Sequence, residues 1–329
     1  YRAGKPWVGI ITFDTYYRGS DMRMHTAILE SLERKGYNVI LGFAADTATK
    51  RNLIENFFLD GNRTPRISGL ITCMGFNLYS GDPLNSTAIL TELDLPAIAA
   101  VYASNLRAWN ESISGLSSEV YWQIALPEID GRIEPVMIGG GVEETDPQTG
   151  LRYTYYVPIP DRIERLTERL INWIKLRELP NAEKKIALIY YNIGGGKDGI
   201  SASYLNVPES ISNILRALRS AGYNVEEKST AEVINILLGP GLNVGSWAPG
   251  ELEKVVRAGA VTVPVSEYLN WFSLLPETLR NNITATWGPA PGNVMVYNGS
   301  IVIPGVMLGN VFLGPQPMRG FGEDAADLI

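Results

Sequence analysis

The clearest pattern along the chain is an apolar run of strand length followed by a segment whose apolar residues recur with helical spacing. Residues 6–13 (PWVGIITF) form such a run, and a helical pattern begins at residue 27 (AILESLERKGYNV). Residues 184–192 (KKIALIYYN) and the segment from residue 213 (NILRALRSAGYNV) repeat this arrangement, down to a shared Gly-Tyr-Asn-Val. The sequence therefore predicts two copies of one strand–helix–strand unit.

Each copy has the features of a parallel α/β unit. Gly36 and Gly222 suit the left-handed residue that ends a helix, and a new strand is expected directly after each. Strands that are apolar throughout are typical of a parallel sheet covered on both faces. We therefore expect an α/β protein with two Rossmann-like or flavodoxin-like lobes and mostly parallel sheets. Further strands are expected at residues 68–75, 95–103, 258–265 and 293–306, the last with a hairpin around Asn298-Gly299.

The segment between the two copies has a different composition. Residues 106–160 are rich in turn-forming residues, as in GGGVEETDPQTG at residues 139–150. The pattern that follows, residues 161–176, is an amphipathic helix, and Pro180 favours a boundary after it. We expect an α/β domain at residues 1–105, a loop-rich and helical bridge at 106–180, and a second α/β domain at 181–329 that continues beyond the chain end.

Charge and rare residues exclude several classes of function. The formal net charge is −7 and the 28 Lys and Arg residues form no dense cluster, so nucleic acid is not an expected partner. No apolar run approaches the roughly 20 residues of a membrane-spanning helix. Cys73 and His25 are the only cysteine and histidine, so no metal site is expected here. We expect Cys73 to be a buried structural thiol and His25 to lie at the surface or in a helix cap.

Glycosylation-type sequons bear on the compartment. Cytoplasmic localisation is expected, and export remains the alternative because the chain carries several sequons and begins without Met. The sequons are at Asn62, Asn85, Asn110, Asn282 and Asn298.

A glycine-rich loop follows the first strand of the second copy. A Walker A loop requires GxxxxGK and then Ser or Thr, whereas Gly196-Lys197 is followed by Asp198, and Tyr191 stands where the first glycine would be. The spacing GxGxxG does occur, but residues 200–210 separate it from the helix, so a dinucleotide is not expected. Since ligands bind at the carboxyl ends of strands in open α/β sheets, the loop indicates a site for another ligand.

Several long segments resemble one family. KKIALIYYN followed by GKDGISASYLNVPESISNILRALRSAGYNV resembles the large subunit of cobalt chelatase (CobN type), which is homologous to the porphyrin-binding large subunit of magnesium chelatase. SGLSSEVYWQIALPEIDGRI, RLTERLINWIKLRELPNAEKKIALI, WGPAPGN and GNVFLGPQPMRGFGED resemble further blocks of the family in the same order. The resemblance covers nearly the whole chain.

The resemblance implies an ATP-dependent metal insertion. In this family the large subunit holds a tetrapyrrole, here a corrin precursor that receives Co²⁺, while separate motor subunits hydrolyse ATP with Mg²⁺. A histidine-containing block (HFGTHG) is expected shortly after Ile329, so this segment alone is expected to bind no cofactor and to be inactive. Magnesium chelatase is the near alternative. A noncatalytic, exported binding protein of the same architecture is a further one.

The chemistry of a chelatase points to candidate residues in the matched segments. Insertion releases two pyrrole protons, so it requires a base, and the side arms of the ring require polar partners. Glu209 is the candidate base, although capping of a helix is an equal alternative. Lys197 is the expected partner of an acidic side arm. The candidate substrate-binding residues are Tyr190, Asn192, Lys197, Ser203, Tyr204, Asn206, Glu128, Asp130 and Gln316.

Overall fold

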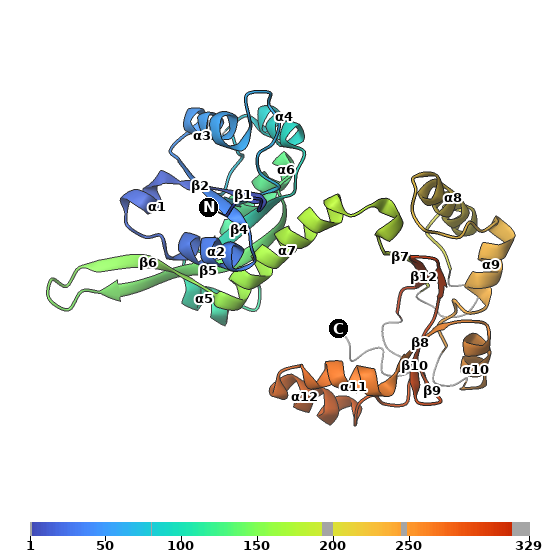
Figure 1. Ribbon diagram of the computed structural model, residues 1–329. Helices are drawn as coiled ribbons and strands as arrows, with labels where there is room; N and C mark the ends of the chain where they lie inside the picture. The colour runs from blue at the N-terminus through green and yellow to red at the C-terminus, as the bar shows by residue number, and fades with distance from the viewer. Residues whose placement is uncertain (1, 80, 193–199, 245–248, 318–329) are drawn as a thin grey trace. The chain divides into compact units, whose positions relative to one another are not determined.

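The computed structural model describes residues 2–79, 81–192, 200–244 and 249–317 (Figure 1). The chain divides into two compact units, Tyr1–Glu178 and Leu179–Ile329. Each unit has its own sheets and its own hydrophobic core. An α/β fold is therefore confirmed.

Unit 1 is built around a six-stranded sheet in the order β2-β1-β3-β4-β5-β6. Neighbouring strands from β2 to β5 are parallel, and only β6 runs antiparallel to its neighbour. The order 2-1-3-4-5 is that of flavodoxin-like sheets. The strands are β1 (Trp7–Phe13), β2 (Asn38–Ala44), β3 (Gly69–Cys73), β4 (Ala97–Ala103), β5 (Ile133–Thr145) and β6 (Arg152–Pro158).

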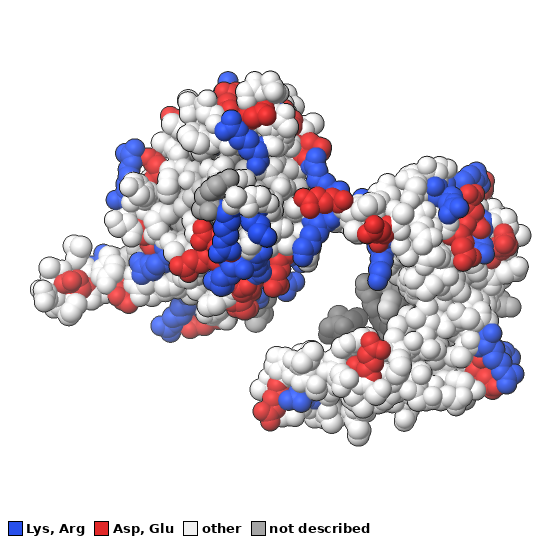
Figure 2. Space-filling model, in the orientation of Figure 1, with Lys and Arg blue, Asp and Glu red and all other residues white. Residues whose placement is uncertain are grey.

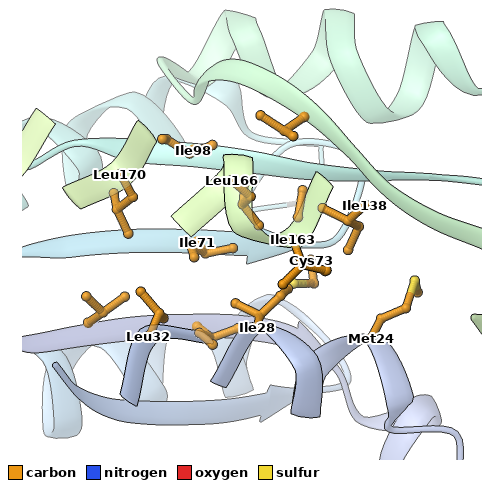
Figure 3. Close-up of a cluster of buried hydrophobic side chains, with 14 of the residues drawn as sticks. Met24, Ile28, Leu32, Ile71, Cys73, Ile98, Ile138, Ile163, Leu166 and Leu170 are labelled. Atoms are coloured by element: carbon orange, nitrogen blue, oxygen red, sulfur yellow. The ribbon is translucent and has the colours of Figure 1, made fainter. Parts of the chain in front are cut away.

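Helices cover both faces of this sheet. They are α1 (Asp14–Arg18), α2 (Arg23–Arg34), α3 (Thr47–Leu53), α4 (Pro83–Leu93), α5 (Leu106–Glu111), α6 (Leu126–Asp130) and α7 (Pro160–Glu178), with π-helical turns at Ile54–Phe58 and Tyr121–Ala125. Figure 3 shows α2 and α7 contributing Ile28 and Leu166 to one core, against Ile71 of β3. On the other face, α3 and α4 pack against Ile11 of β1. Burial on both sides explains why these strands are continuously apolar.

The segment predicted to be a bridge between two domains is part of the first unit in the structure. β5 and β6 are strands of the first sheet, and α7 packs on that sheet, so residues 106–178 are part of unit 1. The three glycines at 139–141 indicated a turn, yet they lie within β5. A Cβ on Gly139 would collide with the main-chain oxygen of Val157 in β6. Glycine is needed there because the two backbones approach closely, and not because the chain turns.

Unit 2 holds two small sheets, and they are not mostly parallel. In β11-β12-β7, only β12 and β7 are parallel, and the sheet β8-β10-β9 is antiparallel throughout. The strands are β7 (Ile186–Tyr190), β8 (Val261–Pro264), β9 (Val296–Tyr297), β10 (Ser300–Ile303), β11 (Val306–Leu308) and β12 (Val311–Pro315). The helices are α8 (Val207–Ser220), α9 (Thr230–Leu238), α10 (Pro249–Arg257), α11 (Val265–Ser273) and α12 (Glu277–Trp287), with a 3₁₀ turn at Asn181–Glu183.

The internal repeat holds only through its helices. Gly36 and Gly222 both have the predicted left-handed backbone, with φ of 89° and 84°. In unit 1 the strand β2 follows at once, but no strand follows α8. The sequences explain the difference, because NVILGFA supplies apolar residues for both faces of a sheet whereas NVEEKST does not. The predicted hairpin at Asn298-Gly299 is confirmed, with positive φ at both residues.

Charged side chains of both signs are interspersed on the face drawn in Figure 2. Within the described residues, no helix has the length and apolar character needed to cross a bilayer.

Leu166 tests whether α7 is structurally part of unit 1. Leu166 is fully buried against the sheet, whereas Leu176 on the same helix is 44% exposed. We expect Leu166→Ala to lower the free energy of unfolding by about 2–5 kcal/mol, because it removes buried methyl groups and leaves a cavity. Leu176→Ala should cost far less. Hydrogen exchange of the β3 and β4 amides measures both, and equal effects of the two variants would contradict this packing.

Candidate functional site

Four polar residues meet at the carboxyl end of the sheet in unit 2. The main-chain nitrogen of Gln316, just after β12, donates to the main-chain oxygen of Tyr190 at 2.7 Å. Asn243 donates from Nδ2 to the main-chain oxygen of Gln316 at 2.9 Å, and its Nδ2 lies 3.5 Å from the main-chain oxygen of Asn192. β7 and β12 are parallel neighbours, so their carboxyl ends bring these residues together.

The side chain of Tyr190 lies on the buried side of this polar edge. Its hydroxyl donates to the main-chain oxygen of Gly241, and its ring is buried among the side chains under α8 and α9. Burial raises the pKa of the Tyr190 hydroxyl above its usual value. A Cβ on Gly241 would collide with that hydroxyl, so glycine is required opposite it. The hydroxyl is therefore engaged within the protein.

Asn192 is the unusual member of the cluster. Its side chain is fully buried, and neither Oδ1 nor Nδ2 has a hydrogen-bond partner among the residues that the structure describes. Burying an amide without partners costs roughly 1–3 kcal/mol, so such a group in a folded protein requires an explanation. Asn192 lies two residues after the end of β7, and its backbone forms an isolated antiparallel bridge with Ile200. The described residues therefore leave both polar atoms of this buried amide without a partner.

Next to this edge, one face of the sheet has little cover. α8 and α9 pack on the face that carries Leu188, Leu313 and Leu308. On the opposite face Ile189 is 49% exposed and Met307 is 53% exposed, with Phe312 partly buried between their strands. The unit therefore presents an apolar surface that adjoins a polar rim.

The remaining motif residues form an exposed entry to α8. Asn206 is the N-cap residue; its Oδ1 accepts from the main-chain nitrogen of Glu209 at 3.3 Å, and its Nδ2 donates to Glu209 Oε2 at 2.9 Å. Tyr204 is fully exposed, and Ser203 has a left-handed backbone with φ of 52°. The capping alternative for Glu209 thus has direct geometric support, and its carboxylate remains open to solvent.

The predicted residues do not all belong to this cluster. Lys197 lies outside the described residues. Glu128 and Asp130 belong to α6 of unit 1, where Glu128 is exposed and Asp130 is buried. Asp130 accepts from Asn77, from the main-chain nitrogen of Leu78 and from Arg132 at 2.6 to 2.9 Å. Its carboxylate is thus already engaged within unit 1.

Sequence reasoning missed Asn243 and the apolar face. Asn243 stands in an irregular segment after α9, and nothing in the residues around it (GLNVG) indicated contact with β7. The face had no signal in the sequence, because β11 and β12 (VML and VFLGP) are apolar at successive positions, as a strand buried on both faces would be.

His25 corrects a further expectation. It is 1% exposed and not at the surface, with Nε2 2.7 Å from the hydroxyl of Thr12 and with Tyr16 as a ring neighbour. Burial lowers the pKa of His25 to about 4. Cys73 is buried as predicted, and burial raises the pKa of its thiol to about 12, which makes it unreactive. Across the described ranges, no group of three or more His, Cys, Asp or Glu side chains is placed to hold a metal ion.

Comparisons with known proteins agree with the resemblance found in the sequence. A model of the family described as CobN/Magnesium Chelatase matches residues 1–329. The chain is 30% identical to the magnesium-chelatase subunit ChlH of rice, over 98% of this chain and 23% of that protein. It is 28% identical to the aerobic cobaltochelatase subunit CobN of Pseudomonas aeruginosa, over 99% of this chain and 26% of that protein.

A solved structure supports the fold. The catalytic subunit of cobaltochelatase from Mycobacterium tuberculosis matches with a TM-score of 0.72 at 24% identity, covering 98% of this chain and 27% of that one. The chain spans about a quarter of the length of these relatives.

His25 makes the stability of unit 1 depend on pH. Its pKa is 6.5 as a free side chain and about 4 when folded, so the unfolded chain binds the proton first as the pH falls. Stability is complete above pH 6.5 and decreases toward pH 4. Between pH 6.5 and 5, above the range of most carboxylates, we expect a loss of roughly 2 kcal/mol. Urea unfolding at these two pH values measures it, with His25→Gln as control; an equal loss in that variant would contradict the assignment.

Proposed function

This chain belongs to the CobN/magnesium chelatase family, and we propose that it is a segment of the tetrapyrrole-binding large subunit of a cobalt chelatase. The complete enzyme would insert Co²⁺ into a corrin precursor in cobalamin biosynthesis, with ATP and Mg²⁺ used by separate motor subunits. The observation that carries the proposal is the buried amide of Asn192, which has no partner among the described residues, beside a sheet face where Ile189 and Met307 are about half exposed.

The two parts of the surface match the two parts of the ligand. A tetrapyrrole is a broad apolar ring with polar side arms, and sites for such ligands combine apolar walls with a few converging polar groups. In this proposal Ile189, Met307 and Phe312 contact the ring. The amide of Asn192 donates to and accepts from a side arm, with Gln316 and Tyr204 at the rim. Lys197 is proposed to pair with an acidic arm.

Proton transfer is the chemistry that the protein must supply. Each of two pyrrole nitrogens loses its proton as it bonds to the metal ion, so two protons leave for every ion inserted. Glu209 is proposed to accept one of them, because its carboxylate is exposed and held by Asn206 at the start of α8. The second proton is proposed to pass to solvent water. The residues of this segment would bind and orient the macrocycle. Metal delivery would require other parts of the large subunit.

Magnesium chelatase is the second candidate. Identity to the rice magnesium-chelatase subunit is 30% and to the Pseudomonas cobaltochelatase subunit 28%, a difference too small to choose the metal. Cobalt is placed first because residues 184–225 resemble the CobN type, but that motif does not by itself choose the metal.

Ile189 tests whether the apolar face binds the ring. We expect Ile189→Glu to weaken binding of a metal-free corrin or porphyrin at least tenfold, because a carboxylate would lose its water against an apolar ring. Ile214→Glu is the matched control, since Ile214 is 41% exposed on α8 and Ile189 is 49% exposed. Quenching of tryptophan fluorescence gives the affinities. Equal binding by both variants would count against this face. In the unmodified protein, tighter binding of the corrin would favour a cobalt chelatase, and tighter binding of the porphyrin would favour a magnesium chelatase.

Asn192 tests whether the polar edge is kept for a ligand at the expense of stability. An apolar side chain of similar size in place of the buried amide removes a desolvation cost. Asn192→Leu should therefore raise the free energy of unfolding by about 1–3 kcal/mol. The same variant should bind the macrocycle more weakly. A variant that is less stable, with affinity unchanged, would show that the amide has a structural role instead.

A further inference from the structure

A cavity of about 290 Å³ lies at the carboxyl end of β4 in unit 1. Ala103, the last residue of β4, forms one wall, and α5 and the loop after it form the others. In open α/β sheets, ligands bind outside the carboxyl ends of the strands. The position is therefore suited to a ligand, and the residues that line the cavity decide which kind.

The chain encloses this cavity by turning back after α5. Asn105 caps the six-residue helix by accepting from the main-chain nitrogen of Ala108 at 2.9 Å. In the loop that follows, Gly115 has a left-handed backbone with φ of 72°, which glycine adopts readily. The carboxylate of Glu119 then accepts from the main-chain nitrogen of Ser104 at 3.0 Å. This bond ties the returning loop to the end of β4.

Glu119 is a buried acid in the wall of the cavity, only 7% exposed. Its hydrogen bonds come from neutral donors, with Ser104 on Oε1 and the hydroxyl of Ser118 3.4 Å from Oε2. Among the residues that the structure describes, no Lys or Arg forms an ion pair with it. A buried charge without a counter-charge is costly, so a cation in the cavity would stabilise this carboxylate.

The carboxylate is ionised at neutral pH despite its burial. Burial raises the pKa of Glu119, but hydrogen bonds from the main-chain nitrogens of Ser104, Ser117 and Glu119 itself outweigh burial and hold the pKa below its usual value. These donors fix the position of the carboxylate and supply no positive charge. The cavity therefore has a negative group in its wall before any ligand enters.

The other lining residues define the kind of cation. Trp109 is partly buried and lines the same cavity, and cations and their alkyl chains pack favourably on indole rings. Ser112 and Ser117 also line it, and their oxygens can accept from an ammonium group, which has three donors and no acceptor. Ala108 and Leu116 add apolar surface for a short chain. These walls match an ammonium group on a small apolar stem.

From these observations we propose that the cavity binds a primary alkylammonium group, with the carboxylate of Glu119 as its counter-ion and Trp109 beside its alkyl chain. A charge-assisted hydrogen bond to the carboxylate would orient the ammonium group. The group belongs either to a free amine or to a lysine side chain. The site uses residues of unit 1 alone, so it does not depend on the tetrapyrrole site proposed in unit 2.

The test is a titration of the whole 329-residue chain with n-butylammonium chloride at constant ionic strength, followed by NMR of the main-chain amides of Ser104 and Ser117. Both signals should shift and saturate. Glu119→Gln keeps an oxygen for Ser104 but removes the charge, so the apparent affinity should fall by about tenfold. Glu111→Gln, which removes an exposed carboxylate from α5, should bind like the unmodified protein.

A second titration, with Nα-acetyl-lysine methylamide, separates the two sources of the ammonium group, because the tighter ligand identifies the source. Sodium chloride in place of the amine measures the general effect of salt. No saturable shift with either amine, or equal affinity in Glu119→Gln, would overturn the proposal. If that variant does not fold, Trp109→Leu decides: an affinity lowered by about threefold or more supports the site, and an unchanged affinity refutes it.

Discussion

The burial of a sheet between layers of helices is the constraint on which the structure depends. In unit 1 both faces of the sheet are closed by helices, with Ile10 and Ile11 of the same strand directed into opposite cores. Polar groups are then confined to the strand ends, where loops and helix termini supply partners. In unit 2, α8 and α9 cover one face of the sheet around β7, and Ile189 and Met307 on the other face are about half exposed.

The same constraint explains what could be predicted from the sequence. Continuous apolar runs identified β1, β3, β4 and β7, and helical periodicity identified α7, because burial dictates those patterns directly. The sequence did not reveal β5 and β6. Gly139 to Gly141 allow close backbone contact within β5, but three consecutive glycines resemble a turn. The sequence repeat also predicted a mostly parallel sheet in the second lobe. That prediction was wrong because Asn224 to Lys228 lack the apolar residues of a central strand.

The candidate site was predictable only where a motif marked it. The pairing of β7 with β12 brings Tyr190, Asn192 and Gln316 together. They lie near the carboxyl ends of two parallel strands, which is where such sheets bind ligands. Glu128 and Asp130 came from a similar motif argument, but they lie in unit 1, and Asp130 is engaged with Arg132. Asn243 could not be found, because contacts made by an irregular segment depend on the whole fold and not on local spacing.

The central claim is that the open face and polar edge of unit 2 hold a planar macrocycle. Hydrogen exchange of the whole chain with and without a saturating metal-free corrin tests this most directly, since it locates the ligand without altering the protein. The account predicts slower exchange in peptides covering residues 186–192 and 306–316, with the helices of unit 1 unchanged. Slower exchange confined to unit 1, with β7 and β12 unaffected, would contradict it.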